Sequence, residues 1–329
     1  MRCVIRDSGN IVVEKSTPIT PKEGECVFSV RAAGICGSDL PRAFSGGAYH
    51  YPIVVGHEFS GVVKDSKNPA LIGRRACVFP ILPCKKCEFC EKQQWANCKN
   101  YDYYGSRRDG GMQAELLIKE ENLILLPDAV SFEAAAMVEP TAVCLHAVKK
   151  ANIDESSSVL VYGAGTIGLL SAMWARALGA KAVFISDIDE RRLAFARALG
   201  FSSYAGESVN VIVEASGASA ALSDGILHCD AFGKVLLVGH SPRDTVIPHS
   251  AFVSILRKQL TLYGCWNSDR SDTADDWREV IEAIADGKID PTALITHKIP
   301  LADAPRAFAI AAGREELSNK VMVVMTDEE

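Results

Sequence analysis

Residues 159–187, VLVYGAGTIGLLSAMWARALGAKAVFISD, decide how this chain folds. They open with an apolar run of β type (159–162), followed by three glycines in the spacing G-x-G-x-x-G. Next comes an apolar pattern with the period of a helix, closed by Gly179, and then a second apolar run (182–186) that ends at Asp187. Strand, glycines, helix, strand and acid in this order predict a βαβ unit with a dinucleotide site.

The three glycines have different roles: the first permits a tight turn, the second lets the backbone approach a pyrophosphate, and the third lets helix pack on strand. Free N–H groups and the dipole at the start of the helix attract phosphate. Asp187 would accept hydrogen bonds from both ribose hydroxyls and repel a 2′-phosphate, which favours NAD over NADP. A structural turn without a ligand is the alternative. The residues expected to contact the cofactor are Gly163, Gly165, Thr166, Ile167, Gly168 and Asp187.

The composition is that of a globular protein without an extreme charge. At 329 residues the chain suits two domains of ordinary size. Its formal net charge of -6 argues against nucleic-acid binding, which requires a basic face. The charged N-terminus does not resemble a signal peptide, and no apolar run reaches membrane-spanning length. Eleven cysteines without an export signal indicate a reducing cytoplasm, and metal binding rather than disulfides.

Two regions of different pattern follow one another along the chain. Residues 1–150 are predicted to be rich in β-structure, with helical patterns only from about residue 131. From 152 to 266 strands alternate with helices, which is typical of a doubly wound parallel sheet. The strands expected in the first region are 27–30, 53–55, 61–63, 76–79 and 114–118. Further along we expect a helix at 189–199, strands at 209–213, 234–238 and 260–263, and a helix at 273–285.

The segment between Gly200 and the strand at 209–213 is too short for the usual crossover. A parallel crossover that contains a helix needs roughly a dozen or more residues. Residues 202–210 fall short of this length, and some of them must form strand. We therefore expect a short connection here without a helix.

Four cysteines are clustered in the pattern C-x2-C-x2-C-x7-C, and they are Cys84, Cys87, Cys90 and Cys98. Four thiolates at this spacing can form a tetrahedron around one zinc ion, which leaves no position for a substrate. The pattern therefore predicts a structural zinc site on an irregular loop. Unligated thiols or a disulfide pair are the alternatives, and a reducing compartment disfavours the disulfide.

Cys36, His57, Glu58 and Glu139 form a second, scattered set of candidate metal ligands. Each lies near glycine or proline, at a turn where a side chain can be directed into a cleft. A thiolate, an imidazole and a carboxylate suit a catalytic zinc ion, which needs an open position for water or substrate. Taken singly, each residue has a structural explanation. A lone cysteine is usually a small apolar residue of the core, a lone histidine is usually hydrogen-bonded within the core, and a glutamate before proline often begins a helix. Their joint occurrence upstream of the nucleotide motif favours the metal.

The order of these motifs resembles that of the zinc-containing medium-chain alcohol and polyol dehydrogenases, and the likeness covers essentially the whole chain. The matching motifs are Cys36-Gly-Ser-Asp, Gly56-His57-Glu58, the four cysteines, Glu139-Pro140 and Gly163-Ala-Gly-Thr-Ile-Gly168. Longer pieces are similar to the branch that acts on polyol phosphates: CGSDLPR (36–42), YPIVVGHEFSG (51–61), YDYYGSRRDGG (101–111) and ILRKQLTLYGCW (255–266).

The resemblance implies an α/β fold with two domains. A GroES-like, β-rich catalytic domain would comprise residues 1–150 and 267–329, and a Rossmann domain with a doubly wound parallel sheet would be inserted between them at 151–266. The resemblance also implies a cleft where the two domains meet, and a protein that is a homodimer or homotetramer.

The resemblance further implies the roles of the scattered ligands. Cys36, His57 and one or both of Glu58 and Glu139 would hold the catalytic zinc. Which glutamate binds the metal directly, and which holds its water, stays open. Ser38, two residues after Cys36, would be the first member of a proton relay.

The implied activity is the zinc-dependent, NAD-linked oxidation of a secondary hydroxyl of a sugar alcohol to the ketose. A polyol phosphate such as galactitol 1-phosphate is expected first, and an unphosphorylated polyol of the sorbitol type, or another alcohol, second. Arg42, Arg107 and Arg108 are candidates for binding phosphate, although arginines in polar loops are usually solvated or paired with acids. Tyr49 and Trp266 are candidates for lining the substrate site. A sensor that binds NAD without zinc chemistry is the alternative from another class.

Overall fold

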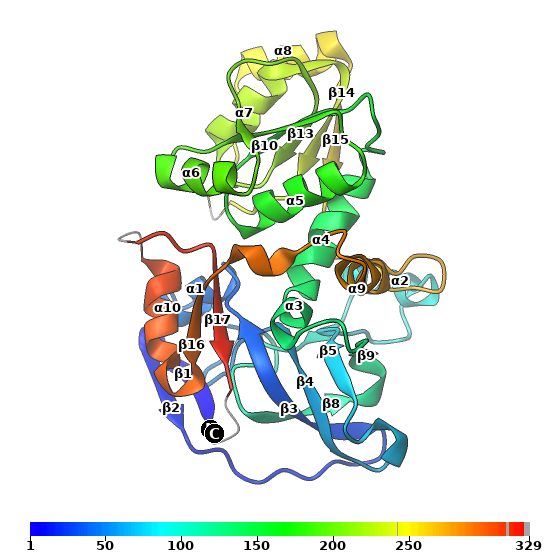
Figure 1. The fold of residues 1–329 in the computed structure, drawn as a ribbon, viewed down its shortest axis with the longest axis vertical. Coiled ribbons are helices and arrows are strands. Elements are labelled where there is room, and N and C mark those ends of the chain that lie inside the picture. The colour runs from blue at the N-terminus through cyan, green and yellow to red at the C-terminus, as the bar shows by residue number, and fades with distance from the viewer. Residues whose placement is uncertain (242, 314–315, 326–329) are drawn as a thin grey trace. The chain divides into compact units, whose positions relative to one another are not determined.

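The structure is a computed structural model that describes residues 1–241, 243–313 and 316–325. Its elements form two compact units, Met1–Glu139 with Asp269–Glu329, and Pro140–Ser268 (Figure 1). The division falls within helix α4 (Val138–Lys149) and after Ser268, where the sequence pattern placed the boundaries after residues 150 and 266. In the described part of the chain, no helix has both the length and the apolar character that crossing a bilayer requires.

The second unit contains a parallel sheet of six strands in the order β12-β11-β10-β13-β14-β15. The strands are β10 (Ser158–Tyr162), β11 (Ala182–Ser186), β12 (Ser202–Ser203), β13 (Val209–Glu214), β14 (Cys229–Leu237) and β15 (Thr261–Gly264). The chain thus moves outward from β10 in one direction and then from β13 in the other. This reversal confirms the predicted doubly wound sheet, and it creates a switch point at the carboxyl ends of β10 and β13, where such sheets bind ligands.

Helices cover both faces of this sheet, with α5 and α6 on one side and α7 and α8 on the other (Figure 1). They span α5 (Thr166–Ala177), α6 (Glu190–Ala198), α7 (Ser219–His228) and α8 (His249–Lys258). Trp174 of α5 is 1% exposed, and its indole N–H donates to the carbonyl of Thr141 at 3.0 Å. Between β12 and β13 the described residues form no helix, as the short spacing predicted.

The first unit is organised around a mostly antiparallel sheet to which both ends of the chain contribute. Its order is β16-β17-β3-β4-β5-β9, and β8 also pairs with β3. The strands are β3 (Glu25–Gly34), β4 (Glu58–Ser66), β5 (Arg75–Val78), β8 (Glu115–Lys119), β9 (Leu123–Leu125), β16 (Ile295–Pro300) and β17 (Lys320–Val324). In Figure 1 the red β17 lies beside the blue β3, and Met322 pairs with Gly34. Phe28 and Phe59 meet edge to face in the core beneath.

Smaller elements complete the first unit. They are the strands β1 (Arg2–Asp7), β2 (Asn10–Glu14), β6 (Ile81–Leu82) and β7 (Asp102–Tyr103), and the helices α1 (Asp39–Phe44), α2 (Glu88–Glu91), α3 (Phe132–Ala136), α9 (Asp276–Ala285) and α10 (Ala304–Ala312). Single turns of 3-10 helix lie at Pro69–Leu71, Trp95–Asn97, Glu120–Asn122, Pro291–Leu294 and Leu301–Asp303.

Three expectations for this unit were wrong. Residues 53–55 form only one bridge, from Ile53 to Ile5, instead of a strand. Helix α1 lies before residue 131, where no helix was predicted. It is too short to show an apolar period in the sequence. Helix α9 begins at Asp276 and not at 273, since the side chain of Asp275 accepts a hydrogen bond from the N–H of Arg278 and caps the helix there.

Candidate metal sites and nucleotide-binding loop

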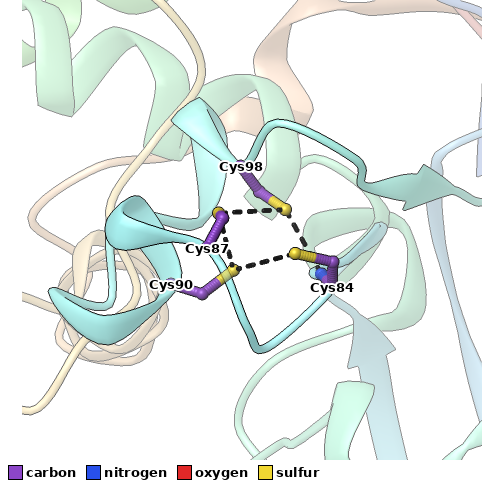
Figure 2. A group of neighbouring side chains, drawn as sticks. All are labelled: Cys84, Cys87, Cys90 and Cys98. Atoms are coloured by element: carbon purple, nitrogen blue, oxygen red, sulfur yellow. Dashed lines mark hydrogen bonds between the residues drawn. The ribbon is translucent and has the colours of Figure 1, made fainter.

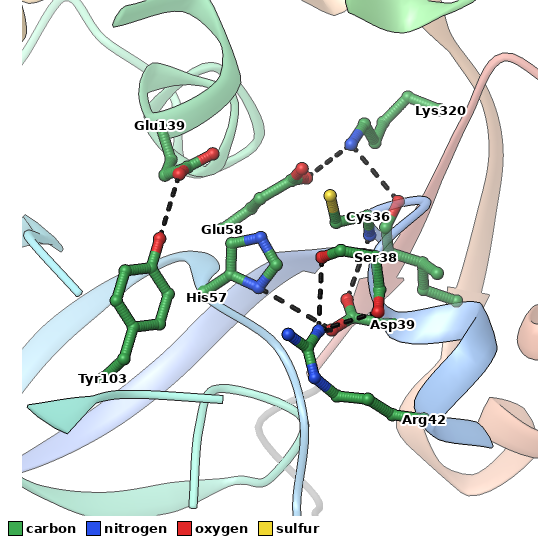
Figure 3. Close-up of polar contacts among 10 residues, drawn as sticks. Cys36, Ser38, Asp39, Arg42, His57, Glu58, Tyr103, Glu139 and Lys320 are labelled. Atoms are coloured by element: carbon green, nitrogen blue, oxygen red, sulfur yellow. Dashed lines mark hydrogen bonds and ion pairs between the residues drawn. The ribbon is translucent and has the colours of Figure 1, made fainter. Parts of the chain in front are cut away.

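The register of β3 against β4 brings the first set of candidate ligands together. Gly34, the last residue of β3, pairs with Glu58, the first residue of β4. Cys36 follows shortly after the one strand, and His57 directly precedes the other. One ligand atom from each of Cys36, His57 and Glu58 lies within 4.8 Å of the others (Figure 3). A Cβ at position 34 would lie 2.2 Å from Glu58 Oε2, so any residue other than glycine would have to displace the Glu58 carboxylate.

His57 is oriented by a buried carboxylate. Its Nδ1 lies 3.6 Å from Asp39 Oδ1 and has no hydrogen bond among the described residues, while Figure 3 shows the other ring nitrogen directed towards Cys36 and Glu58. Asp39 in turn accepts a hydrogen bond from the N–H of Cys36 at 3.1 Å and pairs with Arg42 at 3.2 Å. A carboxylate beside one nitrogen of a histidine, with the second nitrogen facing a thiol and a carboxylate, resembles the arrangement of a metal ligand.

Glu58 forms an ion pair with Lys320, the first residue of β17. Lys320 Nζ lies 2.5 Å from Glu58 Oε2 and donates to the carbonyl of Ile35 at 3.2 Å. Both side chains are almost completely buried, 3% and 1% exposed. Burial acts to lower the pKa of Lys320, but the Glu58 carboxylate outweighs it and the pKa is raised. The pair therefore places a fixed positive charge beside one candidate ligand.

Glu139, in the first turn of α4, faces the same cluster from another direction (Figure 3). The hydroxyl of Tyr103 donates to Glu139 Oε1 at 3.3 Å, and the Tyr103 ring packs against the ring of His57 with centroids 5.7 Å apart. Burial, together with the charge of Glu58, raises the pKa of Glu139 to about 7, although His57, Lys320 and Tyr103 act to lower it. The structure thus groups Glu58 with Cys36 and His57, and holds Glu139 beside them.

The donor set of this cluster fits zinc. It combines sulfur, nitrogen and oxygen ligands, which zinc accepts together in one site. Burial acts to lower the pKa of His57, but the negative groups Asp39, Cys36 and Glu139 raise it to about 10. Several anionic groups thus surround His57, which is favourable for a bound cation.

The four clustered cysteines converge as well (Figure 2). Sulfur–sulfur distances are 3.8 Å for Cys84–Cys90, 3.6 Å for Cys87–Cys90 and 4.0 Å for Cys87–Cys98. A tetrahedral zinc ion with Zn–S bonds of about 2.3 Å requires S–S edges of about 3.8 Å. The N–H group of Lys99, with others, lowers the pKa of Cys87 to about 6. Burial raises the pKa of Cys90 to about 12, so its thiolate requires a cation beside it.

The glycine-rich loop has the geometry of a phosphate site. Gly163 has φ +98°, which glycine adopts readily, and a Cβ at Gly168 would lie 1.8 Å from the carbonyl oxygen of Gly163. By contrast, a Cβ at Gly165 would have no atom closer than 3.8 Å, so the backbone is open at the start of α5, where Thr166 and Ile167 lie. Asp187 accepts hydrogen bonds from the N–H groups of Ala164 at 2.7 Å and Asp189 at 2.9 Å, which fixes it beside this loop.

The other residues predicted to take part in the proton relay or in substrate binding are divided between the two units. Ser38 is exposed, and its hydroxyl accepts a hydrogen bond from Arg42 at 3.2 Å. In the first unit, Tyr49 packs against Arg107, and Arg108 pairs with Asp102. In the second unit, the Trp266 side chain is 62% exposed.

Three residues at the site were missed by reasoning from the sequence. Asp39 lies inside the motif that carries Cys36, so its proximity in sequence was an available signal. Tyr103 and Lys320 gave no such signal, because each reaches the cluster only through the folding of a distant segment.

Comparison with known proteins gives consistent matches over both units. Residues 22–128 match the model of the alcohol dehydrogenase GroES-like domain, and residues 166–286 match that of the zinc-binding dehydrogenases. Galactitol 1-phosphate 5-dehydrogenase of Escherichia coli K12 is 33% identical over 349 residues, covering 98% of this chain and 100% of the relative.

Solved structures agree with these matches. The crystal structure of galactitol-1-phosphate dehydrogenase from Escherichia coli has a TM-score of 0.90 at 30% identity, covering 98% of this chain and 99% of that one. A short chain alcohol dehydrogenase from Escherichia coli CFT073, complexed with the cofactor NADH, has a TM-score of 0.88 at 25% identity, covering 98% of each chain.

Proposed function

Because the chain belongs to the zinc-containing medium-chain dehydrogenases, in their polyol dehydrogenase branch, we propose that it oxidises a secondary hydroxyl of a polyol phosphate, such as galactitol 1-phosphate, with NAD⁺. The observation that carries this proposal is the cluster of Cys36, His57 and Glu58, which unites thiol, imidazole and carboxylate donors. The substrate in the name of the relative that matches over its full length, galactitol 1-phosphate 5-dehydrogenase, supports this choice of substrate.

Cys36, His57 and Glu58 would hold the catalytic zinc, and Glu139 would hydrogen-bond to water or substrate beside it. When bound, zinc lowers the pKa of a coordinated hydroxyl and the nicotinamide accepts hydride. The protein's part is to keep its ligands oriented: Asp39 holds His57, and Lys320 holds one oxygen of Glu58.

Ser38 would take the proton that leaves the substrate hydroxyl. Its oxygen accepts a hydrogen bond from Arg42, so the serine keeps its own proton for donation to a further acceptor. The side chain is exposed, which gives this proton a route to solvent.

The four-cysteine site would bind a second zinc ion with a structural role. Cys84, Cys87, Cys90 and Cys98 supply a complete tetrahedral ligand set, so no position is left for chemistry. Family membership also supports a homodimer or homotetramer, which sedimentation analysis would test.

Asp187 would read the ribose of the cofactor. We expect Asp187→Ser to lower kcat/KM for NAD⁺ on the order of tenfold or more, since a charge-assisted hydrogen bond is lost, and to improve the use of NADP⁺, since a repulsive charge is removed. The two values of kcat/KM measure this. Asp189→Ser is the matched control, because it removes a charge two residues away while serine can still cap α6. An unchanged cofactor preference in Asp187→Ser would show that another residue reads the ribose.

A substrate panel tests the proposed function. Protein with two zinc ions per chain, verified by elemental analysis, is mixed with NAD⁺ and with galactitol, sorbitol, their phosphate esters, threonine and simple alcohols. We expect NADH absorbance to rise with the polyol phosphates. If only the free polyols are oxidised, the substrate is an unphosphorylated polyol of the sorbitol type. If none of these compounds is oxidised, the result favours a sensor that binds NAD.

A further inference from the structure

Arg107 differs from the neighbouring arginines in its lack of an acidic partner. Arg42 pairs with Asp39 at 3.2 Å, and Arg108 pairs with Asp102 at 2.7 Å. Among the residues that the structure describes, Arg107 makes no ion pair. Its guanidinium Nη1 donates at 2.7 Å to a main-chain carbonyl instead, which leaves the positive charge without a counter-charge. Of the three arginines, Arg107 is therefore the one available to an anion.

Two tyrosines hold the guanidinium group of Arg107 in place. It lies 4.1 Å from the ring centroid of Tyr101 and 4.9 Å from that of Tyr49, and the Nη1 bond goes to the carbonyl of Tyr101. Tyr49 is 66% exposed, so this stack borders solvent. The side chain uses one N–H group in its bond to the Tyr101 carbonyl, so other N–H donors of its planar fork are left to match two oxygens of a phosphate.

The loop that carries Arg107 is packed on the segment that carries His57. A Cβ at Gly105 would lie 2.5 Å from the backbone of Gly56, and one at Gly110 would lie 2.1 Å from it, so the two backbones are in direct contact. Asp109 Oδ1 also accepts a hydrogen bond from the N–H of Val54 at 2.9 Å. These contacts fix the position of the loop relative to the candidate metal ligands.

A short aromatic series links Arg107 to the metal cluster. The ring of Tyr101 lies 6.1 Å from the ring of Tyr103, which contacts His57 and donates to Glu139. Two rings, those of Tyr101 and Tyr103, thus connect Arg107 to the candidate ligand His57 within the first unit. A polyol held at its reacting hydroxyl by the cluster carries its phosphate at another carbon, so a cation close to the cluster but outside it suits that end of the substrate.

We propose that Arg107, in contact with the rings of Tyr49 and Tyr101, binds the phosphate of a polyol monophosphate ester and so selects phosphorylated over free polyols. The inference rests on the proposed function and assigns the phosphate end of its substrate. It also explains why Arg107 is unpaired: the phosphate supplies the counter-charge that Asp39 and Asp102 supply to the other two arginines.

The test compares each polyol with its phosphate ester in wild type and Arg107→Ala. We expect kcat/KM for galactitol 1-phosphate to fall on the order of 100-fold, mainly through KM, because a charge-assisted bidentate contact is lost. The kcat/KM for galactitol should change less than about threefold, since free galactitol has no group for Arg107 to bind. Arg107→Lys keeps the charge but lacks the planar fork, so its kcat/KM for galactitol 1-phosphate should lie between the values of wild type and Arg107→Ala.

Arg108→Ala is the matched control, because it removes the adjacent arginine, whose charge Asp102 already neutralises. Arg108→Ala should lower kcat/KM only slightly, and by the same factor for galactitol and for galactitol 1-phosphate. Equal losses for both substrates in Arg107→Ala would overturn the proposal, since they would indicate a structural role. A wild type that oxidises both equally well would overturn it too, while leaving the proposed chemistry intact.

Calorimetric binding of galactitol 1-phosphate separates this inference from the proposed function, because it needs no turnover. We expect Arg107→Ala to bind it about 100-fold more weakly than wild type. Equal affinities would overturn the phosphate site even in an active enzyme. Selective weakening without any oxidation would support the phosphate site and contradict the proposed reaction.

Discussion

Replacement of Cys36 by serine is expected to lower kcat by about three orders of magnitude while leaving the fold intact. Serine is close to cysteine in size, but its hydroxyl is a poor ligand for zinc, so the Lewis acid proposed to activate the substrate would be lost or misplaced. Cys36 lies in a loop and is partly exposed, so we expect the free energy of unfolding of the zinc-free protein to change by less than about 1 kcal/mol. Steady-state kinetics, zinc content and thermal unfolding measure these three quantities.

The matched contrast to this variant is Cys98→Ala. Cys98 belongs to the four-cysteine cluster and is 4% exposed, so its loss should reduce stability first and turnover only as a consequence. Full activity in Cys36→Ser would remove Cys36 from the catalytic site. A Cys98→Ala protein that is stable but inactive would contradict the structural role of the cluster.

The Lys320→Met variant should show the largest loss of stability of a single substitution near the site. Methionine fills the space of the lysine stem but leaves the carboxylate of Glu58 buried without its cation. Breaking one side of a buried ion pair costs about 3–5 kcal/mol. We expect a loss of this size in chelator-treated protein and a smaller loss in zinc-loaded protein, because zinc is the other cation that Glu58 would contact. Denaturant unfolding with and without zinc measures the difference.

Two further variants isolate the ion pair. Lys320→Arg keeps the charge, and Glu58→Gln with Lys320→Met removes both members, so each should recover part of the lost stability. A Lys320→Met protein that is equally destabilised with and without zinc would show that Lys320 acts on the fold alone. In that case Glu58 would not be a zinc ligand, and Glu139 would take its place.

Local patterns predicted the parts of this protein that are built from neighbouring residues. The strand, glycine turn, helix and strand from 159 to 187 form one contiguous βαβ unit, so their order in sequence is also their order in space. The missing helix after Gly200 followed from chain length alone. The cysteines from Cys84 to Cys98 converge because their spacing lets one loop bring them together. Short elements such as α1 were not predicted, because a helix of about one and a half turns is too short to show an apolar periodicity in the sequence.

The sequence by itself determined the doubly wound sheet and the two sets of candidate metal ligands with their chemical character, because each resides in short motifs. Only the tertiary structure decided how the scattered residues combine. The pairing of β3 with β4 places Glu58 with Cys36 and His57, and the pairing of β17 with β3 brings Lys320 from the far end of the chain to Glu58. The physical reason is that strand register acts between segments remote in sequence, and no local pattern encodes which charges will be buried side by side.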